Sequence, residues 1–546
     1  MDLIVDEQNG FRKKRSCEEL IFTLSNVVKK RINDNMSTFV ALIDLEKAFD
    51  CIDRKLLLYK LLCNNIDGKV YKIIKQMYTN TTSCLKLNNI FTDWFEVTCG
   101  VRQGDNLSPT LFSLLINDLA IHMKQLNKGI KVRDDNISIL LYADAMVLIA
   151  KNETNLQYML DAMNEWMNKW RLKVNINKSN VMHFRPRRKA RSRYNFKFNG
   201  QEICVVSLYK YLGVYLDEHM DLKKCAHVLS ESASRALGGV INKFKTLKDC
   251  GYKTFTKLFE TGVLSILNYG AESWGYGNFP KCDNVMNRAM LYFLGVHRIA
   301  SIAALHGDMA WLSLKYTRYI AMLRFWNRLI KMDNSRLTKR IFLWCHDYPD
   351  NTYCEDVKKI SDIMNLSHVY HTKGIFNIEQ IKQTCQELMH VEWQGEVQSK
   401  PKLRTYKIMK IYFEVEPYVN YHVPKYMRSI LAQFRMGILP LHVETGRYKN
   451  VFDREIGAFR RTNVDERTCN ICKLDVVENE KHFLFHCNVY LIERQTFYEE
   501  CIKIIRNFKD MNDDEKLRHI MTHAFWKISL RYVNLIWEKR KSLEFI

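Results

Sequence analysis

Two aspartates, Asp44 and Asp144, are the residues of this chain whose type and setting best suit metal chemistry. Asp44 follows an apolar run, and Asp144 lies in a short turn between the apolar runs 137–141 and 146–149. Together they could bind magnesium, which prefers oxygen ligands, for the transfer of a nucleotidyl group. Ala145 follows Asp144 and can neither bind a metal ion nor accept a proton. The pattern therefore predicts a magnesium site that is one carboxylate short of complete.

Short strands should position both aspartates. The runs 38–43, 137–141 and 146–149 consist mainly of large apolar residues, which is typical of buried strands. A buried strand holds the residue at its end with little freedom, as a metal site requires. Taken alone, each aspartate is more often a helix N-cap or a turn residue.

The segment 100–109 contains two glycines and ends in a Ser-Pro pair, where a helix over 107–123 is expected to begin. Glycines let the backbone approach a ligand closely, and the NH groups of a helix N-terminus can bind a phosphate or a base. A simple capped turn is the alternative. Lys178 follows a helix expected at 155–170 and could contact a leaving pyrophosphate, although a lone lysine is usually only solvated.

Four residues near the C-terminus have the spacing of zinc ligands. Cys469 and Cys472 form a C-x-x-C pair, and His482 and Cys487 follow on what we expect to be a short helix or turn. Three thiolates and one imidazole can close a tetrahedron around zinc. His486 is a rival ligand, and unrelated cysteines in a helical domain are the alternative to a metal site.

The composition favours a nucleic-acid partner. The 546 residues carry a formal net charge of +23 and are 47% hydrophobic, so the chain can form packed domains with a basic surface. Nucleic acid is the simplest partner for that charge, and a merely soluble basic surface is the alternative. The run 185–193 contains six basic residues and is interpreted as a solvated loop, a phosphate contact or, less strongly, a nuclear import signal.

The sequence contains no run of 18 apolar residues and no signal-peptide pattern at its N-terminus, which argues against a membrane-spanning or secreted protein. Most of its 16 cysteines are scattered singly, as expected of reduced thiols. We therefore expect an intracellular protein, in the nucleus, the cytoplasm or both, with no membrane partner.

Short β-rich runs alternate with helical stretches between residues 37 and 216, and this alternation predicts an α+β fold in which helices support a sheet. From about residue 220 the helical pattern dominates. Aromatic residues at helical spacing between 300 and 460 are more often core than base-stacking platforms. Lone histidines such as His183 and His297 are interpreted as core or surface residues. Helices are expected at 54–63, 70–78, 107–123, 155–170 and 314–332, and a strand near 83–87.

The order and spacing of these segments resemble the palm of a reverse transcriptase, specifically that of non-LTR retrotransposons of the LINE type. The resemblance covers most of residues 6–300. It is carried by a fingers-like motif at 6–16, the strand ending at Asp44, the loop 100–109, the turn 142–145, Lys178, a primer-grip-like segment at 209–213, and the segment 267–274.

The resemblance implies specific roles for these residues. Asp44 and Asp144 would bind two magnesium ions, and Phe49 would be the aromatic gate that disfavours a ribose 2′-hydroxyl. The primer 3′-hydroxyl would attack the α-phosphate of a deoxynucleotide. Contacts with nucleotide or template are expected from Arg12, Arg15, Phe49, Gln103, Gly104, Tyr142 and Lys178, and the primer grip is expected at Tyr211, Leu212 and Gly213.

The resemblance also implies a right-hand polymerase architecture followed by a small zinc module. The expected parts are a partial fingers and palm over 1–216, a helical thumb-like region over 217–335, a helical region of unknown role over 336–460, and a zinc-binding module with terminal helices over 461–546. The implied partners are an RNA template, a DNA primer and deoxynucleotides. Protein partners are not indicated.

Two departures from the family pattern bear on activity. The family has two consecutive acids in the turn where this chain has Asp144 and Ala145, and the missing charge should weaken metal binding. The chain also starts almost at the fingers-like motif, so we expect an N-terminally truncated product. Three hypotheses follow: an impaired RNA-directed DNA polymerase, a nucleic-acid-binding remnant without catalysis, or, less favoured, a zinc-dependent interaction scaffold.

Overall fold

A five-stranded sheet with the order β13-β10-β1-β9-β8 lies at the centre of the first of two structural units. The computed structural model describes residues 3–247, 250–453, 458–472 and 474–544. The first unit comprises 1–225, 269–276 and 318–378, and the second comprises 226–268, 277–317 and 379–546. The chain therefore passes between the units several times.

The central strand β1 (Thr38–Ile43) pairs antiparallel with both β9 (Ala145–Ala150) and β10 (Asn180–Phe184). All six of its residues are buried, as expected of a strand with both faces covered. At the edge, β8 (Ile139–Tyr142) forms a hairpin with β9, and β13 (Val205–Val206) adds to β10 in parallel. The predicted strands around Asp44 and Asp144 are confirmed.

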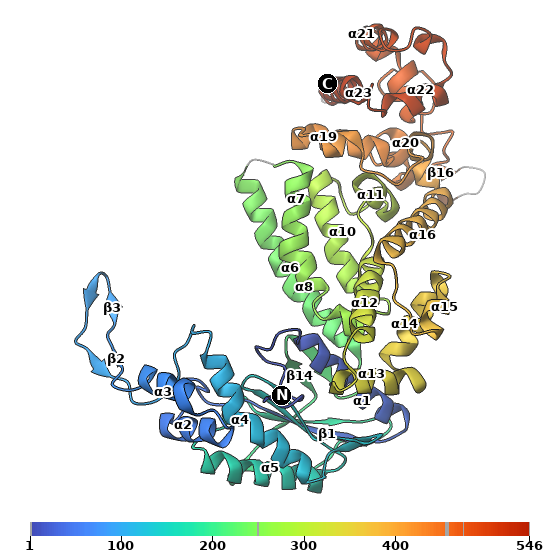
Figure 1. The fold of residues 1–546 in the computed structure, drawn as a ribbon. Helices are drawn as coiled ribbons and strands as arrows, with labels where there is room; N and C mark the ends of the chain where they lie inside the picture. Colours follow the sequence, from blue (N-terminus) through green and yellow to red (C-terminus); the bar gives the residue numbers. More distant parts are fainter. Residues whose placement is uncertain (1–2, 248–249, 454–457, 473, 545–546) are drawn as a thin grey trace. The chain divides into compact units, whose positions relative to one another are not determined.

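Helices cover both faces of this sheet (Figure 1). The long helix α1 (Cys17–Asn33) packs on one face, and α4 (Ser108–Gln125) and α5 (Glu153–Lys169) pack on the other. The side chain of Asn152 caps α5 by accepting from the amide of Asn155 at 2.9 Å, and Pro109 lies in the first turn of α4. The predicted α+β fold class is confirmed.

The remaining elements of the first unit surround this core. They are α2 (Arg54–Cys63), α3 (Gly68–Met77), β2 (Thr82–Ser83), β3 (Lys86–Leu87), β4 (Ile90–Phe91), β5 (Phe95–Glu96), β6 (Ile130–Val132), β7 (Asp135–Ile137), β11 (Lys197–Phe198), β12 (Gln201–Glu202), β14 (Leu208–Tyr211), β15 (Val214–Asp217), α9 (Ala271–Trp274), most of α12 (Leu314–Ile330), α13 (Leu337–Asp347), α14 (Tyr353–Ile363) and α15 (Ser367–His371).

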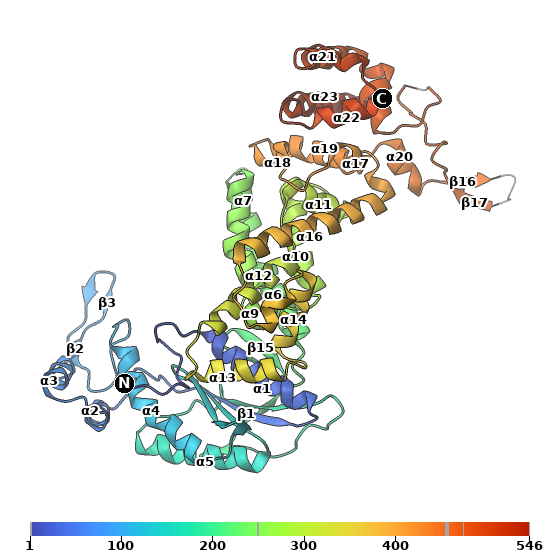
Figure 2. The same cartoon turned by 45° about the vertical axis from the view of Figure 1, so that its right-hand side comes forward.

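The second unit is mainly helical (Figure 2), and the predicted dominance of helices after about residue 220 is confirmed. Its helices are α6 (Leu222–Thr246), α7 (Tyr252–Phe259), η1 (Glu260–Leu264), α8 (Ser265–Leu267), α10 (Pro280–Leu294), α11 (Ile302–Met309), α16 (Ile378–Ser399), η2 (Pro401–Leu403), α17 (Tyr406–Met409), α18 (Pro417–Asn420), α19 (Lys425–Arg435), α20 (His442–Thr445), η3 (Gly446–Tyr448), η4 (His482–His486), η5 (Asn488–Tyr490), α21 (Leu491–Ile502), η6 (Phe508–Asp510), α22 (Asp513–Ile520) and α23 (Trp526–Glu544). Within the described residues, no helix is both long and apolar enough to cross a membrane.

One antiparallel strand pair in the second unit was not predicted from the sequence. It consists of β16 (Asn450–Asp453) and β17 (Ala458–Arg461). Val451 and Phe459 in these strands are exposed. The two strands therefore lack the alternation of buried apolar and exposed polar residues by which a strand is identified in a sequence.

A buried ionic cluster stabilises the second unit. Asp308, which is fully buried, accepts two hydrogen bonds from the equally buried guanidinium of Arg435, at 3.0 and 3.2 Å. The hydroxyl groups of Tyr406 and Tyr418 donate to the same carboxylate at 3.0 and 2.6 Å. Every strong acceptor position of Asp308 is therefore used within the protein.

Replacing this carboxylate should destabilise the second unit strongly. We expect Asp308→Asn to lower the free energy of unfolding by about 3–5 kcal/mol, because it leaves a buried guanidinium without its main partner. Urea denaturation of the full chain, followed by circular dichroism, measures the change. Glu538→Gln, which removes an exposed ion pair with Lys541, should cost about 0–1 kcal/mol; equal effects of the two substitutions would contradict the expectation.

Candidate active site

Asp44 lies directly after β1, and backbone contacts on both sides hold it in place. Its amide donates to the Ser179 hydroxyl at 3.1 Å, and its carbonyl accepts from the Asn175 amide at 2.8 Å. The loop that carries Lys178 thus supports the residue at the end of the strand. The Asp44 side chain stays about one-third exposed, so its carboxylate can reach a ligand.

Asp144 occupies the second position of a two-residue turn between β8 and β9, where Tyr142 pairs with Ala145. Ala143, at the first position, has a positive φ of 54°, which is unusual for alanine. The side-chain oxygen of Gln8 holds this turn, because it accepts from the Ala143 amide at 3.0 Å and from the Gly10 amide at 2.7 Å. The N-terminal segment therefore fixes the position of Asp144.

Gly10 allows this close approach. A Cβ atom at residue 10 would lie 2.3 Å from the backbone nitrogen of Ala143, so any larger residue would displace the turn. The neighbouring backbone forms a short parallel bridge between Gln8 and Leu141, with the Asn9 amide donating to the Leu141 carbonyl at 2.9 Å. The fingers-like motif thus adds a strand-like segment to the edge of β8.

The two aspartates are close enough for their charges to interact. Burial raises the pKa of Asp44, Lys178 lowers it, and the charge of Asp144 raises it further. The Lys178 ammonium lies 4.0 Å from the Asp44 carboxylate. The fold therefore brings together three of the predicted residues, and the lysine partly offsets the repulsion between the two acids.

Ala145 lies at the position where a second acidic residue of the turn would be. Ile43 pairs with Met146 in the ladder between β1 and β9, so the same register continued by one residue places Asp44 opposite Ala145. Side chains at directly opposed positions of an antiparallel pair lie on the same face, about 5 Å apart. An acid at position 145 would therefore project beside Asp44.

The carboxylates of Asp44 and Asp144 fit a magnesium ion. Magnesium is commonly held by one or two carboxylates together with water and substrate phosphates, and both side chains are partly exposed. A bound cation would also offset the repulsion between the two carboxylates. When bound, such an ion would activate a hydroxyl nucleophile and neutralise charge on a phosphate.

The glycine loop lies against the segment that follows Asp44. The Gln103 amide group donates to the Asp50 carboxylate at 2.8 Å, and Gly100 has a φ of +80° with no room for a Cβ atom beside the Asp50 carbonyl. Gly104 also has a positive φ, of +85°, but faces open space. Phe49 stacks on Phe112 of α4, with ring centroids 5.1 Å apart, so the predicted gate residue has a fixed ring.

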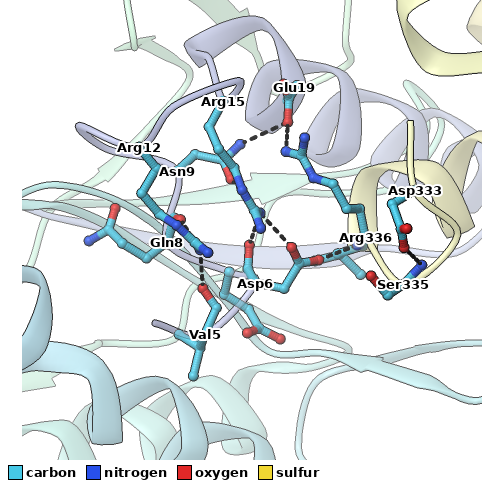
Figure 3. Close-up of polar contacts among 12 residues, drawn as sticks. Val5, Asp6, Gln8, Asn9, Arg12, Arg15, Glu19, Asp333, Ser335 and Arg336 are labelled. Atoms are coloured by element: carbon cyan, nitrogen blue, oxygen red, sulfur yellow. Dashed lines mark hydrogen bonds and ion pairs between the residues drawn. The ribbon is translucent and has the colours of Figure 1, made fainter. Parts of the chain in front are cut away.

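Arg12 and Arg15 bind atoms of the N-terminal segment (Figure 3). Arg12 donates to the carbonyl groups of Val5 and Gln8, at 2.7 and 3.0 Å. Arg15 forms an ion pair with Asp6 and donates to its carbonyl at 2.9 Å. These contacts brace the segment that supports the Asp144 turn, a structural task that the sequence pattern did not indicate.

The primer-grip-like residues form the turn of the β14–β15 hairpin. Leu212 and Gly213 have positive φ values of 45° and 88°, and the Tyr269 hydroxyl donates to the Leu212 carbonyl at 3.0 Å. A Cβ atom at residue 213 would lie 2.4 Å from the Tyr269 ring, so glycine is needed there. Burial raises the pKa of Tyr211 well above its ordinary value, so this tyrosine stays neutral.

Tyr142 points toward α1 and does not carry a free phenolate. A hydrogen bond with Cys17, together with burial, raises the pKa of Tyr142 to about 12. The predicted contact between Tyr142 and a nucleotide would therefore involve a neutral phenol.

The basic run 185–193 is largely paired within the first unit. Arg185 and Arg191 contact Glu218, at 3.0 and 3.5 Å, and Arg187 contacts Asp221 at 2.8 Å. Lys189 donates to the Asn35 carbonyl at 2.6 Å. His183 is buried and stacks on Phe39, and His297 is exposed, which confirms the interpretation of both histidines.

The four predicted zinc ligands converge in the second unit. The ligand atoms of Cys469, Cys472, His482 and Cys487 all lie within 4.8 Å of one another, and the Cys472 sulfur lies 3.5 Å from Nε2 of His482. Three of the four residues are buried. The rival ligand His486 instead contacts Asp513 at 2.7 Å.

The local fold explains this convergence. A bridge between Thr468 and Val477 closes the loop that carries Cys469 and Cys472, and the π-helix η4 presents His482, with Cys487 directly after it. Phe483 and Leu484 are buried beneath, as expected. A hydrogen bond between Cys469 and Cys487 lowers the pKa of Cys469 and raises that of Cys487.

Two residues that support this group were missed from the sequence. Glu478 lies 3.5 Å from the Cys469 sulfur and forms a buried ion pair with Arg540 of α23. Burial raises the pKa of Glu478 to about 7. Because the partners are 62 residues apart, no local sequence signal could have identified the pair.

Comparison with known proteins gives one family match. Residues 1–216 match the family described as "Reverse transcriptase (RNA-dependent DNA polymerase)". The "RNA-directed DNA polymerase from mobile element jockey" of Drosophila melanogaster is 26% identical over 223 residues, which is 40% of this chain and 24% of the relative.

Other similar proteins include the "Retrovirus-related Pol polyprotein from type-1 retrotransposable element R2" of Nasonia vitripennis, which is 25% identical over 40% of this chain and 22% of its own. The chain thus matches about a quarter of the length of these relatives. Among solved structures, apo telomerase from Candida tropicalis is 11% identical, with 69% of this chain and 56% of that chain covered; its TM-score of 0.32 is too low to support an argument.

Proposed function

Residues 1–216 are a reverse transcriptase domain related to the RNA-directed DNA polymerases of non-LTR retrotransposons, and from this we propose that the domain binds an RNA template and a DNA primer and slowly extends the primer with deoxynucleotides. Asp44 and Asp144 would hold magnesium, and Lys178 would meet the leaving pyrophosphate. The reduced rate follows from Ala145, which supplies no oxygen ligand.

The observation that carries this proposal is the meeting of Asp44 and Asp144. They are 100 residues apart in the sequence, yet the pairing of β9 with both β1 and β8 brings them to the same end of the sheet. The surrounding hydrogen bonds of Ser179, Asn175 and Gln8 hold both backbones in place. Such fixed, partly exposed acids are what phosphoryl transfer requires, because its catalysis depends on positioning and charge stabilisation.

Primer extension on an RNA template tests the assignment of Asp44. We expect the purified chain to give slow, magnesium-dependent extension, and Asp44→Asn to lower its rate at least 100-fold, equivalent to about 2.7 kcal/mol. The exposed Asp93→Asn in the β4–β5 connection is the matched control and should keep the rate. Extension that survives Asp44→Asn would show that the assigned carboxylate is not used.

A second candidate function is favoured by Ala145 alone. With only two acids at the site, the domain would bind primer and template without extending the primer. Full-strength, salt-sensitive RNA binding with no extension, even when position 145 is changed to aspartate, would support this second function over the first.

The group Cys469, Cys472, His482 and Cys487 would hold one structural zinc ion. Four protein ligands leave no open position for a substrate, which is typical of structural zinc sites. The Glu478–Arg540 pair would orient this group as an outer shell.

A further inference from the structure

A basic cavity lies in the first unit beside the C-terminal half of α12. Its volume is about 690 Å³, and its lining includes five cationic side chains, one carboxylate and no aromatic ring. The lining residues are Lys14, Arg324, Asn327, Arg328, Lys331, Met332, Asp333 and Arg336. None of these residues belongs to the site formed by Asp44 and Asp144.

Ion pairs and hydrogen bonds hold two of the lining side chains, Arg328 and Arg336, in place. Glu19 of α1 is fully buried and forms ion pairs with both Arg328 and Arg336. Arg336 also donates to the Lys14 carbonyl at 3.0 Å, and Arg328 donates to the Ser16 hydroxyl at 2.9 Å. Figure 3 shows Glu19 and Arg336 side by side, with Asp333 at the edge of the same region. Two guanidinium groups are therefore held in fixed positions.

Two other cationic side chains of the lining, Arg324 and Lys331, form no ion pair with Glu19. Arg324 and Lys331 are exposed, and within the described part of the chain no ion pair involves either of them. Arg324 and Arg328 lie at i and i+4 on one face of α12, and Lys331 follows directly after the helix ends at Ile330. At 1.5 Å per residue, the seven residues from 324 to 331 span about 10 Å. This span is longer than a single phosphate group, so the three cations can contact more than one phosphate. The Asp333 carboxylate accepts from the Ser335 amide at 2.8 Å.

We propose that this cavity binds consecutive backbone phosphates of single-stranded RNA, outside the site at Asp44 and Asp144. Guanidinium and ammonium groups are the usual partners of phosphate oxygens, and the absence of aromatic rings from the lining leaves no platform on which bases could stack. Contacts with phosphates carry no sequence information, so binding at this cavity is independent of sequence. The inference rests on the proposed function only for the choice of RNA as the polyanion.

The experiment compares RNA binding by variants of the full chain. Arg324→Gln with Lys331→Gln removes two cavity charges without touching the Glu19 ion pairs. Lys131→Gln with Lys151→Gln removes two exposed charges elsewhere in the first unit and is the matched control. Binding of a fluorescent oligouridylate is measured by anisotropy at several salt concentrations, without nucleotides or primer, so the result does not depend on polymerisation.

We expect the cavity double variant to bind the oligouridylate about tenfold more weakly at 0.1 M salt, and the slope of log K against log salt to fall by about 1.4, since each phosphate contact in a single strand contributes about 0.7. The control should keep both values. Equal binding by the native chain, the cavity variant and the control would overturn the proposal, whatever the extension assay shows.

Inorganic tripolyphosphate distinguishes RNA from a free polyphosphate as the ligand. If tripolyphosphate binds the native chain and not the cavity variant, while both bind oligouridylate equally, the cavity is a small-anion site and the proposal is wrong. If the cavity variant loses affinity for oligouridylate, the proposal is supported. Thermal unfolding of each variant checks that the substitutions leave the fold intact.

Discussion

Replacing Ala145 with aspartate should raise the rate of RNA-templated primer extension by about 100-fold, equivalent to about 2.7 kcal/mol. The register of β1 and β9, continued by one residue beyond the Ile43–Met146 pair, places position 145 opposite Asp44, so the new carboxylate would project toward the same cation site. A third acid adds an oxygen ligand where two dications must be held close together. Single-turnover extension with saturating magnesium measures the gain.

The controls for this substitution separate charge from size. The asparagine of Ala145→Asn has nearly the same volume as the aspartate of Ala145→Asp but carries no charge. This variant should leave the rate close to that of the native chain. Adding Asp144→Asn to Ala145→Asp should remove the gain, because the new acid works with its neighbour. If the asparagine variant accelerates extension as much as the aspartate variant does, the metal-ligand explanation is refuted.

Cys469→Ser should abolish stoichiometric zinc binding and unfold the zinc module. Structural zinc contributes on the order of 10 kcal/mol to the folding of small modules, and Cys469 is buried at the centre of the four-residue group. Elemental analysis of the purified full chain measures the zinc content. Limited proteolysis should then give new cleavage between residues 466 and 490.

Two variants test whether the ligand set is correct. Cys501→Ser changes a buried cysteine of the adjacent helix α21 outside the group, and it should retain one zinc ion per chain. His486→Ala should also retain zinc, because that imidazole contacts Asp513. Loss of zinc from His486→Ala, with retention in His482→Ala, would reverse the assignment of the histidine ligand.

Local patterns predicted the elements that carry the site. The strand 38–43 and the helix 54–63 have the bounds expected from their apolar residues, since hydrophobic periodicity acts over short distances. The C-x-x-C pair with its following histidine and cysteine likewise depends on short spacing, and the structure brings these four residues together. The meeting of Asp44 and Asp144 required the family resemblance as well, because nothing local links residues 100 positions apart.

The polar partners of charged side chains were not predictable from the sequence. The contact of Arg12 and Arg15 with nucleotide or template stays a prediction, and the structure adds that their guanidinium groups bind Val5 and Asp6. The Glu19–Arg336 pair joins residues 317 positions apart. A charged side chain carries no sequence signal for its partner, because the partner is selected by burial and by the packing of whole elements.

The hydrogen bonds between Gln8 and the turn at Ala143 have a consequence for folding. They join residues 135 positions apart, and closing so long a loop is slow and entropically costly. The hairpin of β8 and β9, by contrast, is local and can form early. Asp144 should therefore acquire its final alignment only when the N-terminal segment docks on β8, so the order of assembly would leave the acid loosely placed until the last long-range contact forms.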